Sequence, residues 1–405
     1  MKNHGIERRR FLGNLGLGAL GSIAASDLLA QAADTQQEKT IAGFDETNAG
    51  AVEAKAWEPV SDRKIRVGIV GYGLCQFGAG FGFQNHPNVT VAAVSDLFPD
   101  RCQGLAKACG CEKTYPSLEE LVKDDTIEAV FVATDAPSHA RHCIEVMKHG
   151  KHVASAVPAV FASLEDADKL LEAVKMTGQT YMLFETSHYR PDCYAMRQVY
   201  NAGGLGKLVY AEGEYYHFSV DQLDSYNGWR EGVPPQYYPT HSNAYYVCVT
   251  GGSFTEVSCL GMRSTLERLQ PERSRYQNPF GTEISLFRTS EGGMARMAVS
   301  WDTPGLEGEV GRVRGQRGSM TGTTYEGLEK NLPNIEKPQL PPGMPAGGHG
   351  GSHGYLTNEF ITAILQNRQP ECGIVQALAL SVPGVVAHRS ALKDGELMKV
   401  PQYQL

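Results

Sequence analysis

The chain has 405 residues, which is enough for two domains of ordinary size. Hydrophobic residues make up 41% and charged residues 20%, a composition that excludes a wholly disordered, collagen-like or coiled-coil protein. The formal net charge of −8 argues against a partner that is a nucleic acid or an anionic membrane.

The first 32 residues have the order of features of an export signal. Arg8-Arg9-Arg10 precede Phe11-Leu12, a weakly apolar, glycine-rich stretch follows, and Ala30-Gln31-Ala32 resembles a cleavage site. Consecutive arginines before Phe-Leu resemble a twin-arginine signal, which carries folded proteins out of a bacterial cytoplasm. We therefore expect a periplasmic or secreted protein with no stable membrane span once residues 1–32 are removed. Residues 33–62 are polar and predict a linker or N-terminal arm.

Residues 64–70 predict the first strand of a nucleotide-binding unit, because they form a short run rich in β-branched residues. Gly71 and Gly73 follow, and then Leu74, in the turn where such units bind a pyrophosphate. The third position of the glycine fingerprint is Gln76, and the next glycine is Gly78.

A second predicted strand, residues 89–95, ends at Asp96. An acid about 20 residues beyond the glycines is where a ribose 2′-hydroxyl is bound. Leu97 follows Asp96 rather than a basic residue, which favours NAD over NADP as the cofactor. The alternative for Asp96 alone is a helix or turn cap.

Strands and helices continue to alternate along the next 90 residues, which predicts a doubly wound parallel sheet over residues 63–185. Thr134 and His139 follow the third strand, where this fold binds ligands, although His139 could equally be a polar residue of a helix's first turn. The expected elements are a helix from the capping box at Ser117, a strand over 127–133, a helix ending near Gly150, a strand over 151–155, a helix from Ser163 to Gly178 and a strand over 180–184.

The chain resembles the Gfo/Idh/MocA oxidoreductases in a set of short segments. The segments are Ala129 to Thr134, His139, His149 to Val153, Pro158, Glu359 to Ile361 and Ala387 to Ser390. The resemblance implies an NAD(P)-binding Rossmann domain with Pro158 near the cofactor, followed over residues 186–405 by an α+β domain with a large open, mostly antiparallel sheet. It also implies a sugar or cyclic polyol as substrate and a homo-oligomer paired through the open sheet.

The chain departs from the family at Ala156-Val157-Pro158, where dehydrogenases have Glu-Lys-Pro. The lysine helps to move the hydroxyl proton, and Val157 cannot. The NAD-dependent glycosidases of glycoside hydrolase family 109 have Glu-Val-Pro, so their valine matches while their glutamate is Ala156 here. Further segments resemble that branch, namely Glu185 to Arg190, Trp229-Arg230, Tyr238 to His241 and Gly347 to His353.

The catalytic candidates are His241 and Tyr238. An imidazole titrates close to working pH and is suited to take a hydroxyl proton, and Tyr238, three residues earlier, would lie on the same side of a helical turn. The resemblance places both beside the nicotinamide, whereas a histidine after Pro-Thr could otherwise be a structural residue at a helix start. The substrate-binding candidates are Tyr189, Arg190, His217, Trp229 and Arg230.

No metal site is predicted. The nine cysteines include no C-x-x-C pair, and we expect them to be mostly reduced, buried side chains. His349 and His353 are four apart, but the neighbouring glycines disfavour a stable helix, so residues 331–354 predict a flexible loop that could cover the cleft.

Three functions are consistent with the sequence. The first is an exported NAD-binding enzyme that moves a hydride between a sugar carbon and the cofactor, with His241 as base and Tyr238 assisting. The second is a redox-neutral glycosidase, in which the same hydride step forms a transient ketone. The third is a non-catalytic sugar-binding protein that has kept the fold.

Overall fold

The computed structural model describes residues 56–306 and 308–405. The predicted export signal and residues 33–55 of the predicted arm lie outside the described residues. No helix in the described part of the chain is long and apolar enough to cross a membrane.

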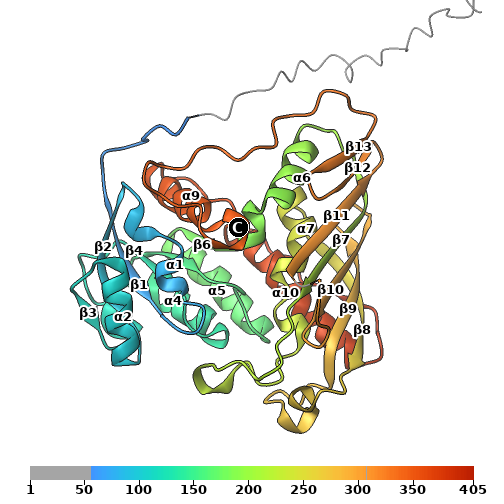
Figure 1. Ribbon diagram of the computed structural model, residues 1–405, viewed down its shortest axis with the longest axis horizontal. Coiled ribbons are helices and arrows are strands. Elements are labelled where there is room, and N and C mark those ends of the chain that lie inside the picture. The colour runs from blue at the N-terminus through green and yellow to red at the C-terminus, as the bar shows by residue number, and fades with distance from the viewer. Residues whose placement is uncertain (1–55, 307) are drawn as a thin grey trace, which may run out of the picture. The chain divides into compact units, whose positions relative to one another are not determined.

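The first sheet has six parallel strands in the order β3-β2-β1-β4-β5-β6 (Figure 1). This arrangement confirms the predicted doubly wound sheet, because the chain crosses from β3 back to the far side of β1. The strands are β1 Ile65–Val70, β2 Val89–Ser95, β3 Thr114–Tyr115, β4 Ala129–Val132, β5 His152–Ser155 and β6 Tyr181–Leu183.

The helices of this half begin and end where the sequence signals them. Ser117 and Ser163 each accept a hydrogen bond from the backbone N–H three residues later, and Gly178 ends a helix with φ of +66°. These helices are α1 Phe77–Gly80, α2 Pro99–Cys109, α3 Leu118–Leu121, α4 His139–Lys148 and α5 Leu164–Thr177.

The second sheet has eight strands in the order β13-β12-β11-β7-β10-β9-β8-β14. Only β10 and β7 pair in parallel, so the predicted mostly antiparallel sheet is confirmed. The strands are β7 Leu208–Tyr216, β8 Phe254–Arg263, β9 Phe280–Thr289, β10 Met294–Ser300, β11 Gly308–Gly315, β12 Gly318–Thr321, β13 Thr324–Gly327 and β14 Met398–Lys399.

Helices lie between the two sheets in Figure 1, and they connect the two halves of the described chain. Helix α7 packs on β7 and β11, and α10 packs on β8. Helix α9 instead packs on the first sheet, where Phe360 contacts the rings of Phe83 and Phe184. The helices are α6 Pro191–Asn201, α7 Thr240–Thr250, α8 Gly348–Gly351, α9 His353–Leu365 and α10 Ile374–Ala391.

One glycine sets how closely α7 approaches the sheet. A Cβ atom on Gly213 of β7 would lie 2.0 Å from the backbone oxygen of Ser242, in the first turn of α7. Only glycine therefore allows this contact. The same turn carries His241, so the close packing fixes the height of that side chain above the sheet.

All nine cysteines have free thiols, and eight of them are buried, which agrees with the prediction of reduced, packed side chains. The exception is Cys75, which is exposed and lies at the cleft described next.

Candidate functional site

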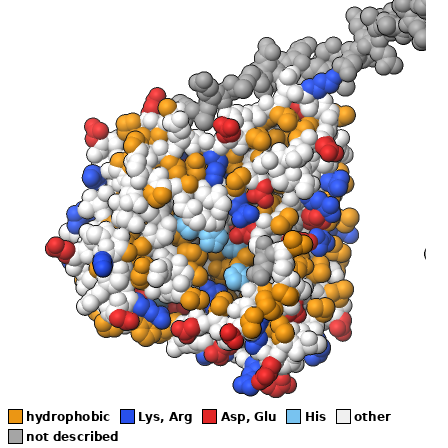
Figure 2. All heavy atoms as spheres, viewed as in Figure 1, with side chains coloured by type: hydrophobic (Ala, Val, Ile, Leu, Met, Phe, Trp, Pro, Cys, Tyr) orange, Lys and Arg blue, Asp and Glu red, His pale blue; other side chains and the backbone are white. Residues whose placement is uncertain are grey.

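A cleft of about 680 Å³ opens at the carboxyl ends of the parallel strands. This volume is within the range of pockets that hold cofactors and other small molecules. Six of the seven predicted cofactor-binding residues line it, namely Gly71, Gly73, Leu74, Asp96, Thr134 and His139. Figure 2 shows a hollow near the centre of this face, with histidine side chains at its rim.

Each glycine of the fingerprint has a distinct steric role. Gly71 has φ of +102°, and a Cβ there would lie 2.2 Å from the backbone oxygen of Ala133. A Cβ on Gly73 would meet nothing within 4 Å, so this position leaves the cleft floor open to a ligand's phosphates. A Cβ on Gly78 would lie 2.4 Å from the oxygen of Gly71, so Gly78 provides the close packing for which the fingerprint uses its third glycine.

Asp96 caps a turn and also lines the cleft. Its carboxylate accepts the backbone N–H groups of Tyr72 at 2.7 Å and of Phe98 at 2.9 Å. These bonds fix the carboxylate at the tip of β2, and a carboxylate has lone pairs left for ribose hydroxyls. The cleft therefore fits a dinucleotide, with an open glycine turn for the pyrophosphate and an oriented acid for the ribose.

His139 is buried and holds two backbone segments together. Its Nδ1 lies 2.9 Å from the oxygen of Pro158, and its Nε2 lies 3.1 Å from the oxygen of Thr134. Burial lowers the pKa of His139, so the ring is neutral and donates one of these two bonds. His139 thus starts α4 as a structural residue and also supports the wall of the cleft. Pro158 is buried after a cis peptide bond and does not line the cleft.

Ala156 and Val157 line the cleft beside the cofactor turn, and each is only 6% exposed. The two residues that replace Glu-Lys of the family pattern therefore lie inside the candidate site. Neither side chain can carry a proton, so any proton transfer here has to use another group.

A smaller cavity of about 70 Å³ shares three lining residues with the cleft, namely Trp229, Arg230 and Tyr238. The Arg230 guanidinium lies 4.2 Å from the centre of the Trp229 ring, and Trp229 stacks on Tyr238 at 6.4 Å. Tyr276 fixes the loop by donating its hydroxyl to the backbone oxygen of Trp229 at 2.7 Å.

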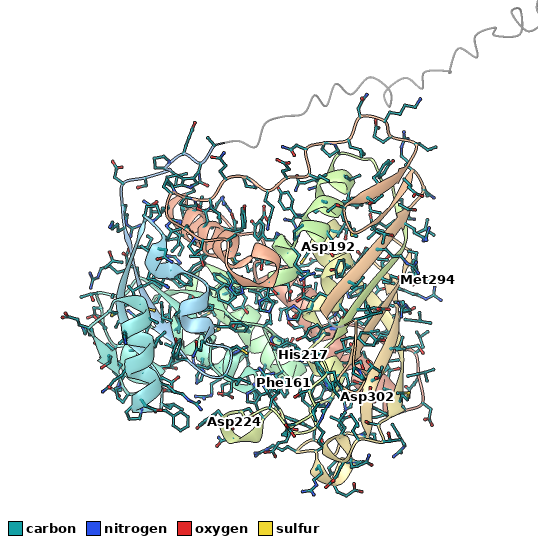
Figure 3. All side chains as sticks on the ribbon, in the orientation of Figure 1. Phe161, Asp192, His217, Asp224, Met294 and Asp302 are labelled. Atoms are coloured by element: carbon teal, nitrogen blue, oxygen red, sulfur yellow. The ribbon has the colours of Figure 1, made fainter. Side chains whose placement is uncertain are left out.

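Tyr215, near the end of β7, and His217, just after β7, line the same small cavity. His217 is labelled in Figure 3 in the space between the two sheets. Aromatic faces suit the C–H surfaces of sugar rings, while Arg230 and His217 offer hydrogen bonds to hydroxyl groups. The structure thus brings three of the five predicted substrate residues, Trp229, Arg230 and His217, to one place.

His241, in the first turn of α7, lines neither cavity itself but contacts Tyr215 and Tyr238, which line the small cavity. Its ring centre is 4.7 Å from that of Tyr215 and 5.8 Å from that of Tyr238. Its Nδ1 is 2.7 Å from Oε1 of Glu185 and 3.9 Å from Oε1 of Glu309. Because Nδ1 is engaged, Nε2 is the atom available to a substrate hydroxyl.

The two carboxylates change the acidity of the imidazole. Burial lowers the pKa of His241, but Glu185 and Glu309 outweigh burial and raise it to about 9. Burial raises the pKa of Glu185, but His241 outweighs burial and lowers it to about 2. His241 is therefore a protonated imidazolium near neutral pH rather than the unperturbed ring considered from the sequence.

Tyr238 lies beside His241, but the two residues do not share the helical turn that the sequence predicts. It follows the short 3₁₀ helix η5 (Pro235–Tyr237) and has φ of −128° and ψ of 57°, so it is outside α7 and does not share a helical turn with His241. The two rings meet because the chain turns at Pro239. Burial raises the pKa of Tyr238 to about 12, so its hydroxyl keeps its proton.

Tyr189 and Arg190 line neither cavity. The Tyr189 hydroxyl donates to Glu371 at 3.0 Å, and its ring stacks on Tyr355 at 5.5 Å. The Arg190 side chain donates to the backbone oxygen of Glu309 at 3.2 Å. Arg190 therefore supports the strand that carries Glu309 instead of facing the cavity.

The sequence assigned no role to Glu185 or Glu309. Glu185 lies two residues after β6 and is fully buried. An acid just beyond the carboxyl end of a predicted parallel strand was the signal available in the sequence. Glu309 lies on β11, far away in the sequence, and no local pattern connects it with His241.

The histidine-rich end of residues 331–354 also lies at the site. The His349 ring is 6.4 Å from that of His241, and its Nδ1 is 2.9 Å from Nε2 of His353. Residues 331–347 contain no helix or strand, and His349 has φ of +49° inside the single turn α8. The predicted loop is therefore present beside His241, while its flexibility remains a prediction.

Comparison with known proteins confirms the family resemblance. Residues 65–185 match the Gfo/Idh/MocA model, described as an oxidoreductase family with an NAD-binding Rossmann fold. This description confirms the predicted cofactor class. Over 178 residues the chain is 32% identical to glycosyl hydrolase family 109 protein 1 of Bacteroides thetaiotaomicron, a match that covers 41% of this chain and only 38% of that relative.

A longer match links both halves of the chain to the same group. The chain is 23% identical over 387 residues to a glycosyl hydrolase family 109 protein of Solibacter usitatus, which covers 84% of this chain and 88% of the relative. A family 109 protein of Akkermansia muciniphila is 23% identical over 98% of this chain.

Solved structures share the fold at low identity. Levoglucosan dehydrogenase, in complex with NADH and levoglucosan, has a TM-score of 0.67 at 16% identity and covers 84% of this chain and 100% of its own. The scyllo-inositol dehydrogenase of Lactobacillus casei, with NAD(H) and scyllo-inositol, has a TM-score of 0.65 at 13% identity and covers 83% of this chain and 99% of its own. These likenesses show a shared fold, with a parallel sheet followed by a mostly antiparallel sheet.

Proposed function

Since residues 65–185 match the NAD-binding oxidoreductase family, we propose that this protein is an NAD-dependent enzyme acting on a sugar or sugar derivative. NAD, when bound by Gly71, Gly73 and Asp96, would supply a hydride acceptor for a ring carbon of the sugar. The observation that carries the proposal is that the cofactor cleft and the aromatic cavity share Trp229, Arg230 and Tyr238.

The residues around the shared wall have separable roles. Trp229 and Tyr215 would bind the apolar face of the sugar, and Arg230 would bind hydroxyl groups. His241 would exchange a proton with the reacting hydroxyl through Nε2, while Glu185 holds Nδ1. Because the pKa of His241 is about 9, the protonated ring would donate a proton to a carbonyl oxygen near neutral pH and accept one from a hydroxyl at higher pH.

The test starts with the purified full chain and NAD. We expect NAD to bind with a measurable heat in calorimetry and NADP to bind more weakly, because Asp96 repels a 2′-phosphate. A panel of free sugars is then scored for NADH absorbance. If no nucleotide binds, both the dehydrogenase and the glycosidase functions are excluded. A non-catalytic sugar-binding protein is then the function that fits best.

A redox-neutral glycosidase is the second candidate, and one observation favours it. The long matches are to family 109 proteins, and Val157 agrees with the valine of that branch, whereas Ala156 does not. In this reaction the oxidised sugar carbon would acidify the neighbouring C–H, which permits elimination of the leaving group. Aryl glycosides separate the two candidates, since a glycosidase releases the aglycone without accumulating NADH.

We also propose that residues 1–32 direct export by a twin-arginine route. The support is the order of basic, apolar and small residues in that segment. Fractionation of cells that express the full chain tests this proposal. Replacing Arg8, Arg9 and Arg10 together by lysine should leave the protein in the cytoplasm.

A homo-oligomer is proposed from the second sheet. The outer face of β8 to β11 carries exposed apolar side chains, and in Figure 1 no helix covers this face within the described chain. Met294 is labelled in Figure 3 on the side of the sheet away from the helices. The exposed residues are Leu260, Met262, Ile284, Leu286, Met294 and Val310.

A further inference from the structure

A second cluster of chemically reactive side chains lies in the core, separate from the cleft. The ligand-type atoms of His188, Cys248 and Cys372 all lie within 4.8 Å of one another, and all three residues are buried. Cys193 lies outside this group of three, and its thiol donates to the backbone oxygen of Ala244 at 3.7 Å, one helical turn before Cys248 on α7. None of these residues lines either cavity of the proposed active site.

We propose that His188, Cys248 and Cys372 hold a structural zinc ion, with Cys193, which lies just outside the 4.8 Å group, as the fourth ligand. Three thiols and one imidazole are a ligand set of closed, four-coordinate zinc sites. The sulfur and nitrogen ligands of a tetrahedral zinc ion lie about 3.5–4 Å apart, given zinc–ligand distances of about 2.0–2.3 Å. The 4.8 Å limit that contains the three atoms is therefore compatible with one shared ion.

The orientation of His188 supports this assignment. Its Nδ1 faces the cluster, 3.2 Å from Sγ of Cys372, while its Nε2 lies 2.6 Å from Oε2 of Glu371. Zinc-bound histidines commonly donate their other ring N–H to a carboxylate, which orients the ring and strengthens it as a ligand. The chain supplies this partner from the residue next to Cys372.

The surroundings also supply a positive charge close to the cluster. Three thiolates and a zinc ion would carry one net negative charge in the core, which needs a nearby cation. The Arg197 guanidinium is almost buried and donates to the backbone oxygen of His188 at 2.8 Å and of Cys248 at 3.4 Å. Arg197 also lies 3.8 Å from the half-exposed carboxylate of Glu371, so the arginine connects the cluster to that carboxylate.

The four ligands come from four segments that carry the proposed active site. His188 lies in the 3₁₀ helix η3 (Thr186–Tyr189), directly after Glu185, and Cys248 lies on α7, two turns after His241. Cys193 lies in α6, and Cys372 precedes α10. A zinc ion here would tie η3 to α7 and so hold Glu185 against His241. The zinc proposal itself does not require that NAD or a sugar binds.

The test measures zinc in the full chain, purified without chelators and under reducing conditions. We expect about one zinc per chain by elemental mass spectrometry, and a loss of at least about tenfold in Cys248→Ser. Cys143→Ser is the matched control, because Cys143 is equally buried but lies in α4, on the Rossmann side of the molecule. The control variant should keep the zinc.

A second measurement does not depend on a variant that folds. After chelation, Co²⁺ added to the wild-type chain should give the intense sulfur-to-cobalt absorption of thiolate ligands, and Zn²⁺ should displace it. The proposal is overturned if the isolated wild type contains no zinc and gives no sulfur-to-cobalt absorption after chelation. It is also overturned if peptide mass spectrometry finds a disulfide between two of Cys193, Cys248 and Cys372 in the isolated protein.

Discussion

The Nδ1 atom of His241 lies 2.7 Å from Oε1 of Glu185, and both side chains are buried. This contact joins the first turn of α7 to the end of the parallel sheet, and so it connects the half with the antiparallel sheet to the half with the NAD-binding fold. It also engages Nδ1 of His241 and raises the pKa of the imidazole.

The first prediction concerns the pH dependence of sugar oxidation. A hydroxyl proton can be accepted only by the neutral imidazole, so the rate should rise with pH and level off above pH 9, where His241 is deprotonated. Glu185→Gln removes the nearest carboxylate and should shift this rise to lower pH by about 1–2 units. The measurement is the pH profile of kcat/KM for NADH formation.

Glu283→Gln is the matched control for this variant. Glu283 forms an equivalent buried pair, with Nδ1 of His388 at 2.7 Å from its Oε1, but it lines neither cavity. This control should lower stability without moving the pH profile. A profile that is the same in Glu185→Gln and the wild type would show that His241 is not the titrating group.

The second prediction concerns stability, which should depend on pH through the same pair. The pKa of His241 is raised above its ordinary value of 6.5, so its contribution is complete below pH 6.5 and is lost as pH rises through about 9. The pKa of Glu185 is lowered from 4.5 to about 2, so its contribution is complete above pH 4.5 and is lost as pH falls towards 2.

Thermal unfolding at a series of pH values tests the direction of this pH dependence. The difference in Tm between the wild type and His241→Asn should be largest between pH 4.5 and 6.5 and should shrink on either side. A difference that grows from pH 7 to pH 10 would contradict the raised pKa of His241.

Much of the cofactor half could be predicted, because its signals are local. The strand over 89–95 has the predicted bounds, and Ser117 and Ser163 cap helices as expected. The strand predicted over 127–133 is shorter, Ala129–Val132, since an apolar run does not show where ladder hydrogen bonds stop.

The second half was less predictable because its contacts join distant segments. Glu309 reaches His241 from β11, and the cluster of His188, Cys248 and Cys372 draws on η3, α7 and the loop before α10. Tyr238 shows the same limit on a small scale, because a spacing of three predicts a shared helical turn only if the helix includes both residues. Where a helix begins after a proline turn depends on tertiary packing.

The third prediction separates the packing role of a glycine from its cofactor role. Gly78→Ala places a Cβ 2.4 Å from the oxygen of Gly71, so it should destabilise the fold by about 1–3 kcal/mol. Gly73→Ala meets no atom within 4 Å in the free protein, so it should leave Tm unchanged. Its methyl group would occupy the floor of the cleft and should weaken NAD binding by about tenfold, or about 1.4 kcal/mol.

Calorimetric titration with NAD and thermal unfolding of both variants check this pair. Each variant is the control for the other, since both add a single methyl group to the glycine fingerprint, one before α1 and one within it. Equal loss of NAD affinity with an unchanged Tm in both would contradict the assignment of Gly78 as the packing glycine.

The fourth prediction tests the proposed oligomer. Leu286 on β9 is 58% exposed and lies opposite Ser258 of β8 and Arg296 of β10, near the centre of the uncovered face. An apolar sheet face of this kind is typically buried against another surface, and a second copy of the same face offers matching apolar contacts. We expect the wild type to elute as a dimer or a larger assembly in size-exclusion chromatography with light scattering. Leu286→Lys should shift it to the monomer, because an unpaired ammonium group is costly to bury.

Met176→Lys is the control, since Met176 is 76% exposed on α5, away from this face. A wild type that is monomeric at all concentrations, or a Leu286→Lys variant that keeps the wild-type mass, would exclude this face as the interface.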